Sequence, residues 1–144
     1  MNADQKTQAE VTQSLKGMFE AYKKKDLSGV LSYWVTDADL VVIGSGGDEK
    51  AVGVGKYVEG LLQDWAQASV TGTGVKIFVV SAAGVVAWFV ADVTFTYNVQ
   101  GKESAVSGRM TGVMEKRNGK WLWVQMHFST PNAAQAAGQS WSKP

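Results

Sequence analysis

The chain has 144 residues, of which 45% are hydrophobic and 19% are charged, and its formal net charge at pH 7 is +1. A chain of this length and composition is typical of one globular domain that buries about two-thirds of its unfolded surface. The near-neutral charge argues against a nucleic-acid-binding face, which needs clustered lysine and arginine, and the lack of cysteine excludes disulfides and thiolate metal sites.

The first residues are polar, and none of the apolar runs approaches the roughly 20 residues that a membrane-spanning helix needs. We therefore expect a chain without a signal peptide, without a membrane partner and with a cytoplasmic location. A nucleic-acid partner is not expected either.

The N-terminal part of the chain predicts a helical hairpin. Over residues 7–25, apolar side chains recur at helical intervals, at Val11, Leu15, Met18, Phe19 and Tyr22. Thr7 followed by Glu10 fits a capping box, and Asp26 is a good N-cap for a short second helix. The basic run at residues 23–25 is expected at the C-terminus of the first helix, where cations complement the helix dipole.

The middle of the chain predicts one short strand and a third helix. The strand covers residues 38–43 and ends in a glycine cluster at residues 44–48. This cluster lacks the Gly-Lys-Ser/Thr ending of a phosphate-binding loop, so a flexible turn or pocket rim is the better interpretation. Residues 54–68 then carry a helical apolar stripe of Tyr57, Val58, Leu61, Leu62 and Trp65.

The second half predicts four antiparallel strands in a meander, at residues 70–81, 85–99, 104–117 and from residue 120 onward. Residues 1–131 are expected to form the domain, and residues 132–144 a loose tail that carries Trp141. Helices followed by strands predict an α+β fold with the helices on one face of a curved sheet. Strands of this length must bend, and the expected bend or bulge points are Gly72, Gly74, Gly108 and Gly112.

The turn at Asn118–Gly119 decides which residues of the last strand share a face. A two-residue loop pairs Arg117 with Lys120, whereas a three-residue loop pairs Lys116 with Lys120. We favour the three-residue loop, because it makes one face wholly apolar and the other polar and aromatic. It places Met126 and Phe128 inside and forms an outer face from Trp121, Trp123, Gln125 and His127. Aromatic residues with few charges are typical of interfaces, so we predict a homodimer through this outer face.

Three segments of the sequence carry a family resemblance: residues 34–46, 109–113 and 119–131. Together with the order of elements, they resemble the SnoaL-like branch of the nuclear transport factor 2-like superfamily, over about residues 7–131. The last segment is also similar to the end of the association domain of calcium/calmodulin-dependent kinases. The resemblance implies a cone-shaped, curved antiparallel sheet wrapped around three N-terminal helices, open at one end and usually dimeric. It does not imply one activity, because the superfamily includes isomerases, cyclases, dehydratases and epoxide hydrolases as well as non-catalytic binding and assembly domains.

The ketosteroid-isomerase relatives use a tyrosine on the first helix, an aspartate base on the first strand and a second aspartate on a late strand. The corresponding places of this chain hold Met18, Val42 and either Thr111 or Gly112. All three chemical groups are missing, so the resemblance does not extend to steroid-isomerase chemistry by that mechanism.

A cone of this kind offers an apolar pocket between the sheet and the helices. The residues expected to line it are Trp34, Tyr57, Trp65, Trp88, Met110, Met114, Met126 and Phe128. The alternative is an ordinary core, since methionine fills irregular gaps as readily as it contacts ligands. The expected ligand is a small, largely apolar or anionic molecule. We expect no cofactor and no metal, because a lone histidine without clustered carboxylates is a poor metal site.

Asp92 stands within a long apolar strand and is the candidate catalytic base. The turn at Gln100–Gly101 places Arg109 directly opposite Asp92 or one step away, so Arg109 could fix this carboxylate or hold an anionic substrate. The same two residues could instead form an ion pair that stabilises the sheet or the dimer. His127 is the third candidate catalytic residue, as a general acid or base, with an interface histidine as the alternative.

Three functional hypotheses follow from the sequence. The first is a SnoaL-like dimer that binds a small, largely apolar ligand in its cone, without an assigned reaction. The second is a cofactor-independent isomerase, cyclase or hydrolase with Asp92 as base, and the third is a non-catalytic assembly module. An empty pocket that contains Asp92 would favour catalysis, whereas a cone filled by tryptophan and methionine would leave assembly.

Overall fold

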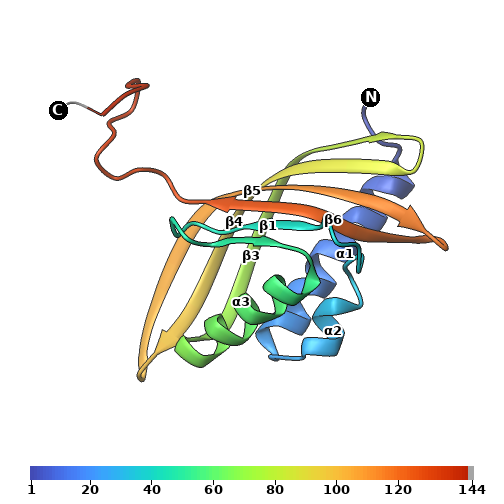
Figure 1. The fold of residues 1–144 in the computed structure, drawn as a ribbon. Coiled ribbons are helices and arrows are strands. Elements are labelled where there is room, and N and C mark those ends of the chain that lie inside the picture. Colours follow the sequence, from blue (N-terminus) through green and yellow to red (C-terminus); the bar gives the residue numbers. More distant parts are fainter. Residues whose placement is uncertain (143–144) are drawn as a thin grey trace.

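A computed structural model describes residues 1–142 of the chain. Its elements follow in the order shown in Figure 1: α1 (Gln5–Lys23), α2 (Leu27–Leu31), β1 (Val41–Ile43), β2 (Lys50–Val52), α3 (Val54–Gln67), β3 (Ser69–Ala83), β4 (Val86–Val99), β5 (Lys102–Arg117) and β6 (Lys120–Ser129). The predicted order of helices and strands is therefore confirmed, with the short strand β2 as an addition.

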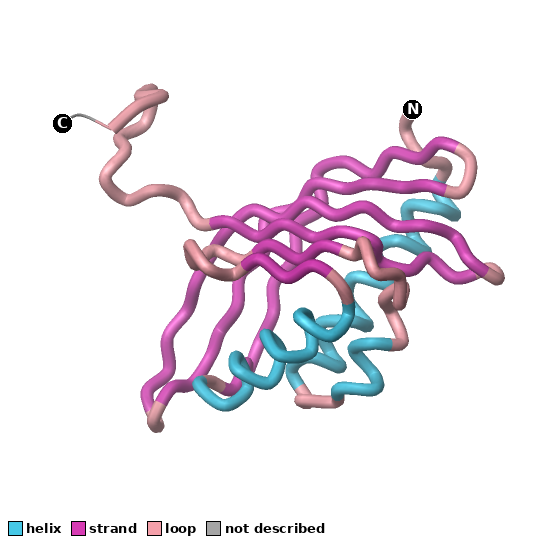
Figure 2. The backbone as a smooth tube through the Cα atoms, in the orientation of Figure 1, coloured by secondary structure: helices cyan, strands magenta, loops and turns pink. Residues whose placement is uncertain are grey.

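All six strands belong to one sheet, in the order β2-β1-β6-β5-β4-β3. Strands β3 to β6 form the predicted antiparallel meander, whereas β1 runs parallel to β6. The long strands curve, and the helices lie against one face of the sheet (Figure 1, Figure 2). The structure confirms an α+β fold with a curved sheet, which is unclosed and mixed rather than wholly antiparallel.

Aspartates define where the first two helices begin. The Asp4 carboxylate accepts a hydrogen bond from the backbone N–H of Thr7 (2.7 Å), so the N-cap of α1 is Asp4 and not Thr7. The Asp26 carboxylate accepts a hydrogen bond from the backbone N–H of Gly29 (3.0 Å) and caps α2 as predicted. The basic run at residues 23–25 follows at the C-terminus of α1, also as predicted.

The β5–β6 hairpin closes with the two-residue loop Asn118–Gly119, because Arg117 pairs with Lys120. Both loop residues have a positive φ (49° and 80°), as tight hairpin turns require. The three-residue loop favoured by the sequence is therefore wrong. The three-residue loop would separate polar from apolar side chains on the two faces of the strand. The hairpin achieves this separation through a different structural feature further along the strand.

This feature is a β-bulge in β6. Met114 pairs with Trp123, but the next residue of β5, Val113, pairs with Gln125, so Val124 is left over on β6. Side chains alternate between the two faces of a strand, so one extra residue exchanges the faces for everything beyond it.

The bulge divides the last strand into two parts with opposite orientation. Trp121 and Trp123 lie before it and face the helices, where they are 6% and 0% exposed. Their predicted place on an outer dimer face is therefore wrong. Beyond the bulge, Met126 and Phe128 pack against the core as predicted, while His127 is exposed. The period-two pattern is thus continuous in each part but changes phase at the bulge.

Charged groups tie the β5–β6 hairpin to the helical layer and to the segment before β1. The indole N–H of Trp121 and Nζ of Lys116 both donate to Glu10 Oε2 on α1, at 2.9 and 3.0 Å. Arg117 Nη1 donates to Asp37 Oδ1 at 2.9 Å. These contacts fix the hairpin from two sides and account for the inward position of Trp121.

Glycines in the sheet serve two different needs. Gly72 lies at a bulge of β3 as expected, whereas Gly74 pairs in regular register. A Cβ atom at Gly112 would lie only 2.5 Å from Cε1 of Phe89, and Gly108 is crowded in a similar way. Gly108 and Gly112 are therefore sites of close packing rather than bend points.

The first residues of the chain protect one edge of the sheet. Asn2 forms a β-bridge with Ser81, and the backbone N–H of Ala3 donates to the Val80 oxygen at 3.0 Å. Strand β3 is an edge strand, and unpaired edges invite association with other chains. The N-terminal segment therefore covers part of this edge.

Candidate functional site

Four aromatic side chains form the centre of the core, and we call them the Trp123 cluster: Trp34, Tyr57, Phe89 and Trp123. Trp123 has its ring centroid 5.4 Å from that of Trp34 and 5.2 Å from that of Phe89. The Tyr57 ring lies 4.6 Å from Trp34. All four side chains are buried, so this cluster joins the segment before β1, α3, β4 and β6 through direct ring contacts.

The residues expected to line a cone pocket are mostly brought together by the structure. Apart from Trp88, they belong to the buried core or pack directly against it. Met110 and Met114 are almost wholly buried. Trp88 alternates along β4 with the buried Ala87 and Phe89, so its place inside the cone is corrected to the outer face.

Among the hollows formed by residues 1–142, two lie against α1 rather than among the expected pocket residues. One has a volume of about 680 Å³ and runs along α1 beside Tyr33. The other, of about 340 Å³, lies between α1 and the β5–β6 hairpin. Tyr33 takes part in both, and its hydroxyl sits so close to Gly17 that a Cβ there would lie 2.2 Å from it. The glycine in α1 therefore admits this tyrosine.

A second group joins aromatic and polar side chains near the C-terminal ends of α1 and α3. We call Tyr22, Asp64 and Trp65 the Tyr22 cluster. The Tyr22 hydroxyl donates to Asp64 Oδ2 at 3.0 Å, and the Tyr22 and Trp65 ring centroids are 5.7 Å apart. Lys25 Nζ donates to the backbone oxygen of Trp65 at 2.7 Å. The buried indole N–H of Trp65 has no hydrogen-bond partner within residues 1–142.

Partial burial shifts the pKa values of two groups in this cluster, although Asp64 keeps contact with solvent. Burial raises the pKa of the Asp64 carboxyl, although the hydrogen bond from Tyr22 opposes the change, and the negative charge of Glu49 adds to it. Burial also raises the pKa of the Tyr22 hydroxyl, assisted by the negative charge of Asp64. Both groups therefore favour their neutral forms more than free side chains do. Such a pair can donate to and accept from a polar group of a ligand.

The three candidate catalytic residues lie elsewhere. Asp92 pairs with Arg109 directly across the β4–β5 ladder, which confirms the expected register. Both are exposed, since Asp92 alternates with buried residues of β4 and points to the outer face. The interpretation of Asp92 as a base inside the cone is therefore wrong. Arg109 donates to Ser129 Oγ at 3.2 Å, and His127 is exposed beside Thr111.

Within residues 1–142, no group of three or more histidine, aspartate or glutamate side chains is arranged to hold a metal ion. Across the same part of the chain, none of the helices has the length and hydrophobicity needed to cross a membrane.

The family assignment rests on the whole domain rather than on one site. Residues 11–133 match the model of the SnoaL-like domain. The chain belongs to this family. In this SnoaL-like chain, Met18 is buried and Val42 packs against the core. Of the two residues that could correspond to the second aspartate, Gly112 is buried and Thr111 is exposed.

Solved structures share this fold at low sequence identity. A nuclear transport factor 2-like protein from Salmonella enterica has a TM-score of 0.79 and 18% identity, over 96% of this chain and 100% of its own. A ketosteroid isomerase-like protein from Erwinia carotovora atroseptica has a TM-score of 0.73 and 17% identity, over 86% and 95%. A candidate calcium/calmodulin-dependent protein kinase II association domain from Xanthomonas campestris has 0.68 and 22%, over 86% and 87%. A search of curated proteins gives no match.

The Tyr22 cluster was missed by the sequence reasoning. The sequence pattern places Tyr22 on the apolar stripe of the first helix and gives no indication of a role for Asp64. The two residues are 42 positions apart, so only the packing of α1 on α3 brings them together. The available signal was the position of Asp64 beside Trp65, where an acidic residue adjoins the apolar stripe of a helix.

Proposed function

We propose that this SnoaL-like chain is an assembly module that forms a homodimer through the outer face of its sheet. The observation that carries the proposal is the apolar surface on this side of β3 and β4. Phe78, Val79 and Val90 are 51%, 44% and 40% exposed. Contiguous apolar surface of this kind typically marks a site of association.

The pattern of β4 supports this interpretation. Its inward residues between Ala87 and Val93 are apolar and buried, as a core requires. Its outward residues include Val86, Trp88 and Val90, where a solvated sheet face would alternate to polar side chains. A strand that is apolar on both faces is typical of one that is covered on both sides. A second copy of the chain would provide the missing cover.

Charges on the same face suit self-association. Asp92 lies between Lys76 on β3 and Arg109 on β5 in one row of paired residues. With a two-fold axis that passes between Asp92 and Arg109, Asp92 of each copy faces Arg109 of the other, so that opposite charges meet. Arg109 and Asp92 are not joined by an ion pair within residues 1–142, and Arg109 donates to the neutral Ser129 hydroxyl, so neither charge is neutralised by an ion pair in this part of the chain.

The interior is a further argument for assembly. The Trp123 cluster and the buried methionines fill the space between sheet and helices. A filled interior favours association over chemistry within a cavity. The candidate association domain from Xanthomonas campestris has the same fold, and at its low identity it supports the proposal by analogy alone.

Light scattering coupled to gel filtration tests the proposal. We expect a dimer at low micromolar concentration, and we expect Val90→Lys on the outer face to give a monomer. The matched control is Leu62→Lys, because Leu62 on α3 is 52% exposed but lies on the other side of the molecule. A strict monomer in the unchanged protein, or a Val90→Lys dimer as stable as the control, would contradict the proposal.

The Tyr22 cluster favours a second candidate function, the binding of a small, largely apolar molecule. It is supported by a hydrogen-bonded tyrosine–aspartate pair beside the buried indole N–H of Trp65, for which residues 1–142 provide no hydrogen-bond partner. Asp64 would accept from a donor on the ligand, and Trp65 would donate to an acceptor. The raised pKa of Asp64 and the nearby charge of Glu49 disfavour an anion at this place. A neutral hydroxyl or amide group suits it better.

Two probes with the same ring system separate this candidate from non-specific binding. We expect 2-naphthol to bind and quench tryptophan fluorescence, and 2-naphthoate to bind far more weakly because it is an anion. Asp64→Ala should weaken the binding of 2-naphthol about tenfold through the lost hydrogen bond. Glu59→Ala, on the exposed side of the same helix, should leave it unchanged. Equal binding of the two probes would exclude the candidate.

A further inference from the structure

The C-terminal tail has a composition that separates it from the domain. Residues 132–142 carry no charged side chain, and the only large one among them is Trp141. The match to the SnoaL-like domain ends at residue 133, so nearly all of this tail is additional to the family domain. Trp141 is 86% exposed. Among exposed residues of this chain, a tryptophan on an uncharged segment is the group best suited to an apolar contact.

The tail is folded on itself rather than extended. The side-chain amide of Asn132 donates to Ser142 Oγ at 3.2 Å, which joins its two ends. Backbone hydrogen bonds from Gln135 to Asn132 (3.0 Å) and from Gln139 to Ala136 (3.1 Å) form two turns between them. These contacts order the segment before any partner binds, which lowers the entropic cost of docking.

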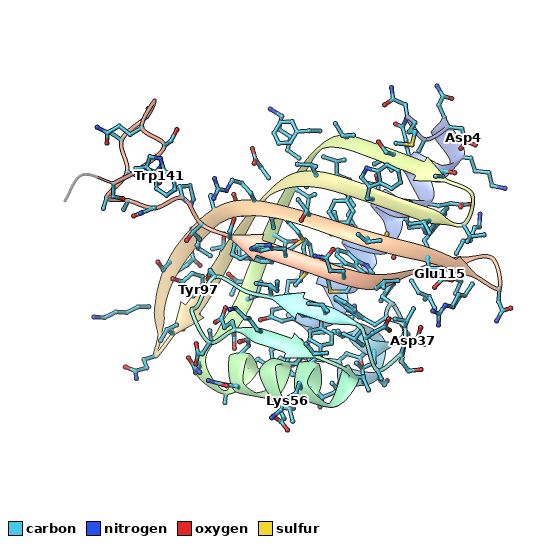
Figure 3. All side chains as sticks on the ribbon, turned by 45° about the horizontal axis from the view of Figure 1, so that its top comes forward. Asp4, Asp37, Lys56, Tyr97, Glu115 and Trp141 are labelled. Carbon is cyan, nitrogen blue, oxygen red and sulfur yellow. The ribbon has the colours of Figure 1, made fainter. Side chains whose placement is uncertain are left out.

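The folded tail carries Trp141 away from its own sheet. Figure 1 shows the tail leaving the end of β6 and projecting beyond the domain. In Figure 3, Trp141 lies on this projecting segment, apart from the side chains of the sheet and helices. The turns therefore present the indole outward, where a second molecule can reach it.

The point of departure of the tail lies in a particular row of the sheet. Ser129, the last residue of β6, pairs with Arg109, which pairs with Asp92, which in turn pairs with Lys76. Neighbouring strands are about 4.8 Å apart, so Ser129 and Lys76 are separated by roughly 14 Å across the sheet. In a dimer formed by the same face of both copies, each tail therefore begins beside the row of paired residues on the outer face of the other copy.

The outer face offers a fitting contact for an indole. Lys76 Nζ lies 5.1 Å from the ring centroid of Phe78, so a cation and an exposed aromatic ring are already together there. Indole is the best aromatic partner for a cation, and tryptophan is enriched among residues that dominate interface energies. The geometry points to Trp141 as an anchor that docks on the outer face of a second copy, beside Lys76 and Phe78.

This inference rests on the proposed self-association through the outer face. Trp141→Ala, and a chain that ends at residue 131, should each weaken the dimer at least about tenfold, measured as the dissociation constant by sedimentation. Gln139→Ala is the control in the same tail and should leave the constant near its original value. Removing the tail leaves the core contacts untouched, so the domain itself stays folded.

Fluorine NMR of protein labelled with 5-fluorotryptophan then locates the indole. The Trp141 resonance is assigned with Trp141→Phe, and we expect its protection from solvent to rise with protein concentration. A dimer in which Trp141 stays solvent-exposed would overturn the inference while leaving the proposed assembly intact. Protection of Trp141 in the Val90→Lys monomer would show that it docks on its own chain and would also overturn it. A strictly monomeric protein would overturn both.

Discussion

The Trp123 cluster and the Tyr22 cluster are both built from aromatic side chains that link distant segments, yet their surroundings differ. Trp123 is enclosed by rings on several sides and has no exposed surface. Tyr22 and Trp65 are partly exposed and share their space with the Asp64 carboxylate. The same residue types therefore serve dense packing in one place and a polar pair in the other.

The difference between the two clusters shows that a high aromatic content does not by itself distinguish a packed core from a binding site. Six tryptophans in 144 residues suggest a ligand pocket or an interface, but Trp34 and Trp123 are buried in the core. An aromatic residue can take part in recognition where a titratable group stands beside it and solvent can reach it, as at Tyr22. It contributes stability where other rings surround it. Substitutions in the two clusters should therefore have unequal effects.

The largest effect is expected for Trp123→Ala. The substitution removes the ring that contacts Trp34 and Phe89, and loss of burial together with the remaining cavity should lower the free energy of unfolding by about 3–5 kcal/mol. Trp65→Ala should cost clearly less, because Trp65 is only partly buried. Urea unfolding followed by circular dichroism measures both. Equal losses would remove the distinction between the clusters.

An intermediate effect is expected for Gly112→Ala, which sharpens the account of the Trp123 cluster. The added Cβ would lie 2.5 Å from Phe89 Cε1 and 3.0 Å from Trp123 Cζ3, and such overpacking typically costs about 1–3 kcal/mol. Gly74→Ala is the matched control, since its Cβ would lie 3.8 Å from the nearest atom, on Thr94. The comparison uses the same urea unfolding. A Gly112→Ala protein as stable as the control would mean that the cluster is loosely packed.

The smallest effect concerns pH and the Tyr22 cluster. Burial raises the pKa of Asp64, so the folded state binds its proton more tightly, and stability decreases as the pH rises above the ordinary value of 3.8. Asp64→Asn should remove this loss and raise the melting temperature slightly at neutral pH. At pH 3, where the carboxyl is protonated in both states, the gain should disappear.

Glu10 provides the opposite sign as a control for that measurement. Hydrogen bonds from Lys116 and Trp121 lower the pKa of the Glu10 carboxyl, so its contribution is present above the ordinary value of 4.5 and is lost as the pH falls. Glu10→Gln should therefore lower the melting temperature at neutral pH and converge with the unchanged protein in acid. The same sign for both substitutions would contradict the assigned environments.

Much of the fold could be predicted from the sequence, because its helices and long strands follow clear periodic patterns. The helices of the hairpin, the meander and the pairing of Asp92 with Arg109 all depend on local signals such as caps, stripes and turns. The short strand β2 and the parallel pairing of β1 with β6 do not. They depend on where the chain returns to the sheet, and three residues give too little pattern to predict this.

The error in the last strand has a specific physical cause. Either phase of the alternation from Trp121 to Phe128 is self-consistent, and both phases occur in the structure, one on each side of the bulge at Val124. Nothing at Val124 itself distinguishes a bulged valine from a paired one. The bulge is fixed by tertiary contacts, among them the hydrogen bond from Trp121 to Glu10, which a sequence does not reveal.

The candidate site was harder to predict than the fold for the same reason. Asp92 interrupts an apolar strand, but a strand with apolar side chains on both faces does not tell which face an exception occupies. Tyr22 and Asp64 each look ordinary within their own helices. Only the contact between the helices makes them a hydrogen-bonded pair, and burial together with nearby negative charge raises their pKa values.

The stacking of Trp34 on Trp123 also has an optical consequence. Two indole rings whose centroids are 5.4 Å apart and whose planes are inclined by 30° absorb ultraviolet light as a coupled pair, because their transition dipoles interact at this range. The protein should therefore show a pair of circular-dichroism bands of opposite sign near the main indole absorption. This signal gives an intrinsic spectroscopic reporter for the interior, which needs no added dye and is independent of whether the chain is bound to a partner.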